Sequence, residues 1–154
     1  LFCSAEPNSS YQVQEVAKCL TEKGIESQEF AFTDSNDVAS VTQSAADYAD
    51  VVYIPTDNTA ASNTEAIANI LVPAGVPAIV GEEGICSGCG VATLSISYYD
   101  LGVTTGKMAA KILTGEADSS TRPLEYTDAT PKYNPTICEA LNITPLDGYT
   151  AIEE

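Results

Sequence analysis

The sequence contains no histidine, and basic residues are scarce in it. Its 154 residues include 6 Lys and Arg against 22 Asp and Glu, which gives a formal charge of −16 at pH 7. Without histidine the chain cannot use an imidazole for catalysis, for metal binding or for switching its charge near neutral pH. The acidic charge argues against nucleic-acid binding, because phosphates require clustered Lys and Arg, and against adhesion to anionic lipid.

Long apolar segments are also missing. No apolar run approaches the roughly 20 residues that a membrane span requires, although hydrophobic residues make up 44% of the chain. That content suits a globular protein rather than a disordered acidic tail, and the length corresponds to one domain of roughly 150 residues. The first residue is Leu1 rather than Met, so we expect a processed or partial form of a longer protein.

The five cysteines are odd in number and irregularly spaced, which is not the pattern of a disulfide scaffold. They are Cys3, Cys19, Cys86, Cys89 and Cys138. The Cys86-Ser-Gly-Cys89 motif has no second CxxC and no histidine with which to form a zinc site. We expect it in a loop over residues 81–90, whereas a thioredoxin-type motif begins a helix. Cysteines without a role are therefore the default, with a local disulfide or a redox role as the alternative.

Apolar spacing predicts an alternation of strands and helices. Strands are expected at 1–3, 25–32, 51–54, 77–80, 91–96 and 124–127, and helices at 11–20, 38–48, 60–72, 98–113 and 135–141. Pro7 argues against either element over 4–10. Such alternation with short connections predicts an α/β fold with a three-layer, Rossmann-like, mainly parallel sheet.

Polar residues follow three of the predicted strands, in the loops 4–10, 56–59 and 81–83. In open α/β sheets, ligands bind beyond the carboxyl ends of the strands, so these loops form one candidate site. Its side chains are Asn8, Ser9, Asp57, Asn58 and Glu82. Asn8 and Ser9 at a helix start suit a carboxylate, the two acids suit an ammonium, and Asn58 offers a donor and an acceptor. The set suits a zwitterion such as an amino acid.

Simpler roles for these residues stay open at this point. Ser9, Asp57 and Asn58 are also good helix N-caps, and Glu82 also suits a solvated loop. No Walker loop, GxSxG elbow or GxGxxG fingerprint is present, and no nucleophile has a histidine partner. We therefore expect no cofactor, no metal and no enzyme. The enzymatic alternative is a small α/β hydrolase or phosphatase that uses Asp57 and Glu82.

Several blocks resemble ABC-transporter substrate-binding proteins of the tryptophan/tyrosine-uptake type. In family order they are Ser4-Ala-Glu-Pro-Asn-Ser9, Asp50-Val-Val-Tyr-Ile-Pro-Thr-Asp-Asn-Thr59, Val76-Pro-Ala-Ile-Val-Gly-Glu82, Ser97-Tyr-Tyr-Asp-Leu-Gly102 and Gly106-Lys-Met-Ala-Ala-Lys-Ile-Leu-Thr-Gly115. Residues 134–143 resemble the family's closing segment. The resemblance covers nearly the whole chain, and the Cys86–Cys89 segment departs from it.

The resemblance implies a type I periplasmic-binding-protein fold, in which two α/β lobes joined by a hinge close on a ligand. Family members are about twice as long, so this chain corresponds to the C-terminal half. Residues 1–90 and 123–154 would form lobe two, 91–115 would cross to lobe one, and 116–122 would be a linker. The family's ligand-contacting positions in this lobe fall on Asn8, Ser9, Asp57, Asn58 and Glu82.

The implied function is capture of a small molecule, such as an aromatic amino acid, for delivery to an ABC permease. The protein would lie outside the cytoplasmic membrane, either periplasmic or anchored as a lipoprotein. A ligand-sensing module of a signalling protein is the other non-enzymatic alternative. If 91–115 belongs to an absent lobe, then Met108, Ala109, Ile112 and Leu113 form an unmatched apolar face. That face predicts a homodimer or a swapped element.

Overall fold

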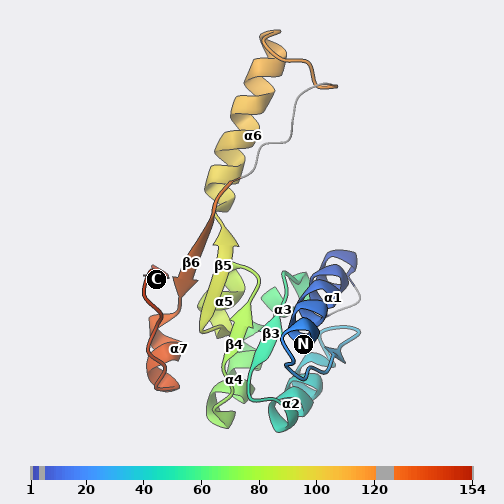
Figure 1. The fold of residues 1–154 in the computed structure, drawn as a ribbon, viewed down its shortest axis with the longest axis vertical. Coiled ribbons are helices and arrows are strands. Elements are labelled where there is room, and N and C mark those ends of the chain that lie inside the picture. The colour runs from blue at the N-terminus through green and yellow to red at the C-terminus, as the bar shows by residue number, and fades with distance from the viewer. Residues whose placement is uncertain (1, 4–5, 121–126, 154) are drawn as a thin grey trace. The chain divides into compact units, whose positions relative to one another are not determined.

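The computed structural model describes residues 2–3, 6–120 and 127–153, and it confirms the α/β alternation (Figure 1). The elements are β1 Phe2–Cys3, α1 Pro7–Glu22, β2 Phe30–Ala31, α2 Val38–Tyr48, β3 Val52–Ile54, α3 Asn58–Ala61, α4 Thr64–Ala74, β4 Ala78–Val80, α5 Glu83–Cys89, β5 Ala92–Ile96, α6 Tyr98–Leu113, β6 Ala129–Tyr133, α7 Pro135–Ala140 and β7 Thr150–Ala151.

The strands pair in parallel, as alternation with helices predicts. β1 pairs with β2, and a second sheet has the order β3-β4-β5-β6-β7, in which β3 pairs parallel to β4, β4 to β5 and β6 to β7. The β1 strand also lies against β3. Tyr53 stands in register with Ile79, so these two side chains share one sheet face and lie on the opposite face from Val52 and Ile54.

Helices α2, α4 and α5 cover one face of the sheet and form the main core with it. Fully buried Ile54 in β3, Ile67 and Leu71 in α4, and Ile85 in α5 belong to this core. α1 lies over the other face, where its Val16 and Leu20 line a groove with Tyr53 and Ile79 (Figure 1). The two helical layers around a parallel sheet give the three-layer arrangement that was predicted.

The chain divides into two compact units. One comprises residues 1–94 and 131–154 and contains the three predicted loops, and the other comprises 95–130 and contains α6. The α6 helix spans 98–113, the range predicted from its periodicity, and Ser97 caps it by accepting a hydrogen bond from the Asp100 N–H at 3.1 Å. No residue of α6 is buried.

Several local predictions were wrong. Pro7 does not interrupt the chain but occupies the first turn of α1, where its missing N–H has no helical partner in any case. The predicted strand over 25–32 is formed only at Phe30–Ala31. The single helix over 60–72 is two helices, and α4 continues through Pro73 to end at Gly75, which has φ of 72°.

The predicted loop over 81–90 contains helix α5, so the Cys86–Cys89 motif is helical. Residues 124–126 of the predicted strand and residues 121–122 of the predicted linker lie outside the described residues. The strand that follows them is β6, over 129–133.

Candidate functional site

Thr56 joins the three predicted loops at the carboxyl end of the sheet. Its carbonyl oxygen accepts a hydrogen bond from Asn8 Nδ2 at 2.8 Å, and its N–H donates to Gln12 Oε1 at 2.9 Å. Its hydroxyl donates to the Gly81 carbonyl oxygen at 3.3 Å. Asn8 and Gln12 are one helical turn apart on α1, so the two amides point from the same side of that helix. The start of α1 and the ends of β3 and β4 therefore meet at this residue.

A buried pair adds a second link between the first two loops. Ser9 Oγ donates to Asp57 Oδ2 at 2.7 Å, and Ser9 and Asp57 are only 0% and 2% exposed. Asp57 Oδ1 accepts from the Ala60 N–H at 2.9 Å, so this carboxylate also caps α3. A hydrogen bond to a charged group contributes about 1.5–3 kcal/mol. The pair therefore holds the α1 start against the end of β3.

Asn8 and Asn58 lie at the surface beside this buried pair. Asn58 Nδ2 donates to Glu6 Oε2 at 2.9 Å. Asn58 is therefore not the cap of the following helix, a role that Asp57 takes. Ser9 is not the cap of α1 either, because Glu6 occupies that position. The exposed amides and the Glu6 carboxylate thus form a polar rim over the buried Ser9–Asp57 contact.

Glu82 follows β4 and caps α5. Its carboxylate accepts hydrogen bonds from the Gly84 N–H at 2.8 Å and from the Ile85 N–H, and the side chain is half-buried. The loop containing Glu82 is drawn close to the Thr56 loop at Gly81, where a Cβ atom would lie 2.6 Å from the Thr56 nitrogen. Only glycine permits that approach, so Gly81 sets the spacing between the two strand ends.

All five residues selected from sequence therefore belong to one end of the sheet, but their surroundings differ. Ser9 and Asp57 are buried and bonded to each other, whereas Asn8 and Asn58 are exposed and Glu82 is half-buried. Sequence reasoning missed Glu6, Gln12 and Thr56. A signal was available for Gln12, because it follows Asn8 by four residues at the start of a helix and so lies on the same side of that helix.

The thiols near this end of the sheet are buried rather than reactive. Cys86 and Cys89 are free and 0% and 1% exposed. Burial raises the pKa of both thiols to about 12, so both are protonated at neutral pH. Cys19 and Cys138 are also free. A disulfide between Cys86 and Cys89 is therefore absent, and neither thiol has the lowered pKa of a redox motif.

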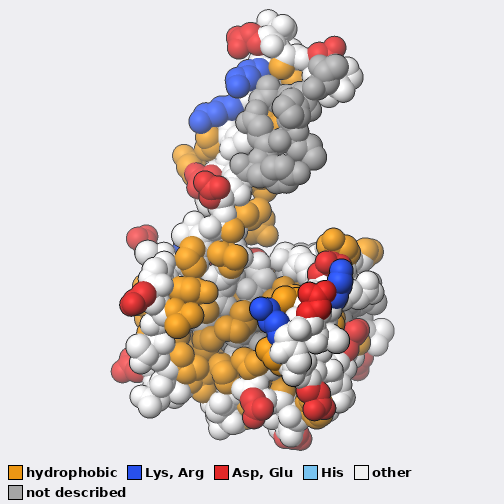
Figure 2. All heavy atoms as spheres, in the orientation of Figure 1, with side chains coloured by type: hydrophobic (Ala, Val, Ile, Leu, Met, Phe, Trp, Pro, Cys, Tyr) orange, Lys and Arg blue, Asp and Glu red, His pale blue; other side chains and the backbone are white. Residues whose placement is uncertain are grey.

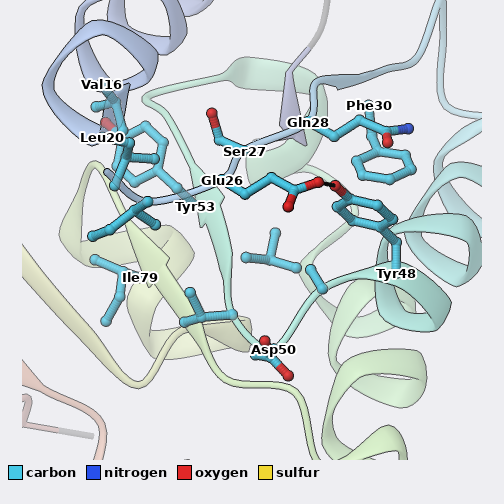
Figure 3. A pocket seen from close by; sticks show the side chains of 14 residues that line it. Val16, Leu20, Glu26, Ser27, Gln28, Phe30, Tyr48, Asp50, Tyr53 and Ile79 are labelled. Carbon is cyan, nitrogen blue, oxygen red and sulfur yellow. Dashed lines mark hydrogen bonds between the residues drawn. The ribbon is translucent and has the colours of Figure 1, made fainter. Parts of the chain in front are cut away.

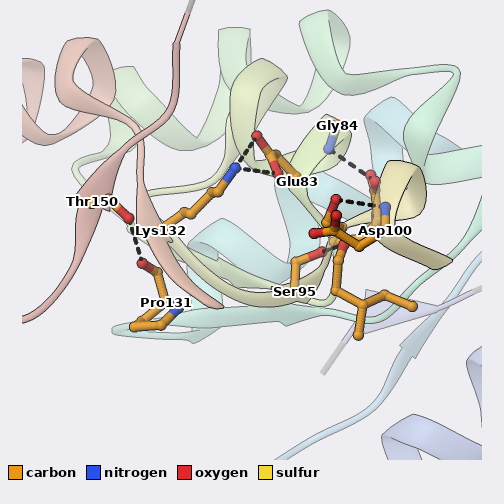
Figure 4. Close-up of polar contacts among 10 residues, drawn as sticks. Glu83, Gly84, Ser95, Asp100, Pro131, Lys132 and Thr150 are labelled. Atoms are coloured by element: carbon orange, nitrogen blue, oxygen red, sulfur yellow. Dashed lines mark hydrogen bonds and ion pairs between the residues drawn. The ribbon is translucent and has the colours of Figure 1, made fainter. Parts of the chain in front are cut away.

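Two contacts hold α5 to the C-terminal segment. Lys132 Nζ lies 2.7 Å from both carboxylate oxygens of Glu83 (Figure 4). Asn134, which is 6% exposed, donates to the carbonyl oxygens of Cys86 and Ser87 at 3.0 and 2.9 Å and accepts from the Ile137 N–H at 3.1 Å. Asn134 thereby caps α7 and satisfies carbonyls in the last turn of α5.

The site geometry combines amides and carboxylates with the N-terminus of the 16-residue helix α1. Helix N–H groups favour anions, and carboxylates favour cations. Within the residues that the structure describes, no cluster of three or more metal-binding groups is present. The arrangement suits non-covalent binding of a small ligand that carries both charges.

Comparison with known proteins is decisive for the family. The family model for ABC transporter substrate binding proteins matches residues 1–149. The chain belongs to this family. A tyrosine-binding protein of Clostridioides difficile is 28% identical over 117 residues, which are 76% of this chain and 34% of that protein.

Solved structures agree with the family assignment. A ligand-free, open substrate-binding protein with adhesive properties from Clostridium difficile has a TM-score of 0.80 and 29% identity, covering 99% of this chain and 52% of that one. An ABC domain in complex with L-Trp from Streptococcus pneumoniae has a TM-score of 0.84 and 27% identity, covering 98% and 53%. This chain therefore spans about half the length of those structures.

Family membership has two general consequences. ABC substrate-binding proteins act outside the cytoplasm, and they are generally not enzymes. In the part of the chain that the structure describes, none of the helices combines the length and the apolar character that a membrane crossing needs.

Proposed function

We propose that this chain is one lobe of the extracytoplasmic substrate-binding component of an ABC importer, and that its ligand is an amino acid such as an aromatic one. The observation that carries the proposal is the convergence of the three strand-end loops at Thr56 in a chain of this family. The tyrosine-binding relative and the L-Trp complex support an aromatic ligand. Delivery to an ABC permease and closure of two lobes are parts of the same proposal.

The proposed ligand contacts are Asn8, Ser9, Asp57, Asn58 and Glu82. Asn8 and Asn58 are exposed and suit direct hydrogen bonds to the ligand. Ser9 and Asp57 act through their buried contact, which orients the loops. Glu82, or Glu6 beside Asn58, supplies the acceptor for an ammonium group.

The proposed domain organisation has three parts. Residues 1–90 and 123–154 form the lobe, 91–115 belongs with a second lobe, and 116–122 links them. The support for a second lobe is that α6 falls in a separate compact unit, 95–130, and buries none of its residues. Anchoring as a lipoprotein, or release into a periplasm, belongs to the proposal for the whole protein.

Calorimetry on the intact gene product tests the ligand. L-Tyr and L-Trp are compared with tryptamine, which lacks the carboxylate, and with indole-3-propionate, which lacks the ammonium. We expect binding of the amino acids and loss of binding for both analogues, because each charge has its own partner in the site. Equal binding of the analogues would overturn the zwitterion site.

Single substitutions test the residues. Asn8→Ala and Asn58→Ala are each expected to raise the Kd about 10–150-fold, the equivalent of a hydrogen bond to a charged group of about 1.5–3 kcal/mol. Asn69→Ala, at an exposed position of α4, is the matched control and should leave the Kd unchanged. An unchanged Kd in both site variants would place the ligand elsewhere.

The enzymatic alternative has little support in this geometry. Asp57 is buried and accepts hydrogen bonds from Ser9 and Ala60, and Glu82 is engaged as a helix cap. A general acid or nucleophile needs a carboxylate that reaches the substrate. Turnover of a phosphate or ester substrate by the purified chain, lost in Asp57→Asn, would contradict the proposal.

A further inference from the structure

Helix α1 carries a row of side chains that changes from apolar to polar along its length. Its members follow one another every four residues and therefore lie on one side of the helix; they are Asn8, Gln12, Val16 and Leu20. Val16 and Leu20 line a groove together with Tyr53 and Ile79 of the sheet (Figure 3). Figure 2, in the orientation of Figure 1, shows hydrophobic side chains gathered over the strands beside this helix. The apolar half of the row thus packs along the strands, and the polar half reaches the strand ends.

The Thr56 N–H finds its acceptor in this row rather than in a neighbouring strand. Strand β3 ends at Ile54, whose carbonyl oxygen accepts from the Gly81 N–H at 2.8 Å, and Pro55 has no N–H to donate. The Thr56 N–H is therefore the first backbone donor after β3, and a donor shielded from water needs an acceptor. Gln12 Oε1 is that acceptor, at 2.9 Å in a partly buried position. The Gln12 amide thus stands where a strand partner would otherwise be.

The other two hydrogen bonds of Thr56 are weaker holds on its backbone. Asn8 Nδ2 donates to the Thr56 carbonyl oxygen at 2.8 Å, but this contact is exposed, so water competes for both groups. The Thr56 hydroxyl reaches the Gly81 carbonyl oxygen only at 3.3 Å, which is long for a bond between two oxygens. Asn8 is in addition a proposed ligand contact. Gln12 is therefore the side chain best placed to hold this peptide.

The Thr56 peptide determines where the next two residues stand. Asp57 continues the chain in an extended conformation, with φ of −142° and ψ of 122°, and α3 begins at Asn58. A change in the direction of the Thr56 peptide therefore moves the exposed Asn58 amide relative to Asn8. Binding groups need to be held to within about 0.5 Å by supporting contacts. Because Gln12 and Asn8 belong to the same helix, the hydrogen bond from Gln12 sets the spacing of the two amides.

We propose that Gln12 is a positioning residue of the amino-acid site. It holds the Thr56 N–H without contacting the ligand, and so keeps Asn58 at a fixed distance from Asn8. A loop that is already held has less freedom to lose when the ligand binds, and this preorganisation increases affinity. The inference rests on the proposed function, in which Asn8 and Asn58 bind the ligand directly.

Calorimetry with L-Tyr and L-Trp on the intact gene product tests the effect on affinity. Gln12→Leu suits the apolar half of the row but has no acceptor for the Thr56 N–H. We expect it to raise the Kd about 3–10-fold, as the loss of one hydrogen bond between neutral groups does. Gln14→Leu makes the same replacement at an exposed position of α1 and is the matched control. Its Kd should equal that of the unmodified protein.

Amide hydrogen exchange without ligand tests the contact itself. Gln12→Leu should make the Thr56 N–H exchange about 3–10-fold faster, whereas Gln12→Glu retains an acceptor oxygen at the same reach and should keep the protection. The Gly81 N–H, which is bonded to Ile54 in the same region, is the internal reference and should keep its rate. A general loosening of the fold would accelerate the exchange of both amides, so equal acceleration would overturn the positioning role.

A double variant tests whether Gln12 acts through Asn58. In an Asn58→Ala background, Gln12→Leu should raise the Kd by a smaller factor than it does alone, because the side chain that it positions is gone. Multiplicative effects, an unchanged Kd in Gln12→Leu or unchanged exchange of Thr56 would each overturn this inference and leave the proposed function intact. An unmodified protein that binds neither amino acid would overturn the proposed function and this inference with it.

Discussion

At the residue scale, the Ser9–Asp57 contact is the part of the site most dependent on burial. A surface hydroxyl can exchange its partner for water, but a hydroxyl that is 0% exposed cannot. The 2.7 Å hydrogen bond therefore supports an acid that is otherwise costly to bury.

We expect Ser9→Ala to lower the free energy of unfolding by about 1.5–3 kcal/mol, because a buried carboxylate oxygen loses this donor. Urea denaturation measures the change. Ser44→Ala is the control, since Ser44 is exposed and donates only to a carbonyl of its own helix; it should alter stability by less than about 0.5 kcal/mol. Equal losses of unfolding free energy in the two variants would show that the Ser9–Asp57 hydrogen bond stabilises the chain no more than an exposed one does.

The buried thiols predict alkaline sensitivity. Burial raises the pKa of Cys86 and Cys89 in the folded chain to about 12 from 9.0. The unfolded chain loses these protons first, so stability is complete below about pH 9 and falls as the pH rises toward 12. Each thiol contributes a slope of about 1.4 kcal/mol per pH unit in that window.

Urea denaturation at pH values between 8 and 11 measures this slope. The double variant Cys86→Ala/Cys89→Ala should have a shallower slope, whatever its stability at pH 7. At pH 8, alkylation followed by peptide mass spectrometry should label exposed Cys19 and spare Cys86 and Cys89 until the chain is unfolded. Labelling of all three in the native chain would contradict their burial.

At the element scale, Gly81 allows the ends of β3 and β4 to approach. A methyl group there would lie 2.6 Å from the Thr56 nitrogen and 2.9 Å from the Pro55 carbonyl carbon. Both are backbone atoms, which cannot rotate away as a side chain can. We expect Gly81→Ala to destabilise the chain by about 1–3 kcal/mol.

Thermal denaturation followed by circular dichroism measures that loss. Gly102→Ala is the matched control, because Gly102 lies in α6 with open space around it. Alanine favours a helix over glycine by about 0.5–1 kcal/mol, so this variant should retain or increase the helical signal. A Gly81→Ala chain as stable as the unmodified one would show that the loops can separate without cost.

Asn134 connects three elements through one side chain. It caps α7, and its amide group reaches two carbonyls of the last turn of α5. Asn134→Ala should cost about 2–4 kcal/mol, because it removes a helix cap and leaves buried acceptors without a donor. Lys132→Met removes the neighbouring ion pair, in which both side chains remain about a third exposed, and should cost no more than about 1 kcal/mol. Chemical denaturation of both variants checks the order of the two effects.

At the scale of the whole molecule, the chain covers only about half of its structural relatives. If those relatives bind between two lobes, a single lobe supplies part of the contacts while the ligand still loses its translational and rotational freedom. We therefore expect the isolated 154-residue chain to bind L-Tyr or L-Trp weakly or not at all, with no shift of its melting temperature at 1 mM ligand. Micromolar affinity measured by calorimetry would contradict the half-site interpretation.

Local patterns in the sequence were sufficient for the order of the elements. Period-3.6 spacing located α2 and α6 closely, since a helix depends mainly on residues three and four positions apart. Alternation of these helices with short apolar strands implied parallel pairing, and parallel pairing placed the three loops at one end of the sheet.

The tertiary structure decided what those loop residues do. Ser9 and Asp57 are 48 positions apart, as are Asn134 and Cys86, and no local spacing indicates which of them pair or become buried. The helix over 83–89 depends on Glu82 as its cap and on burial of Ile85 and both cysteines, so its glycines misled a local prediction. Only packing decides which surface stays open. The exposure of Ile79 and Leu94 on the sheet therefore emerges from the structure alone, whereas an unmatched apolar face on α6 was already predicted from the sequence.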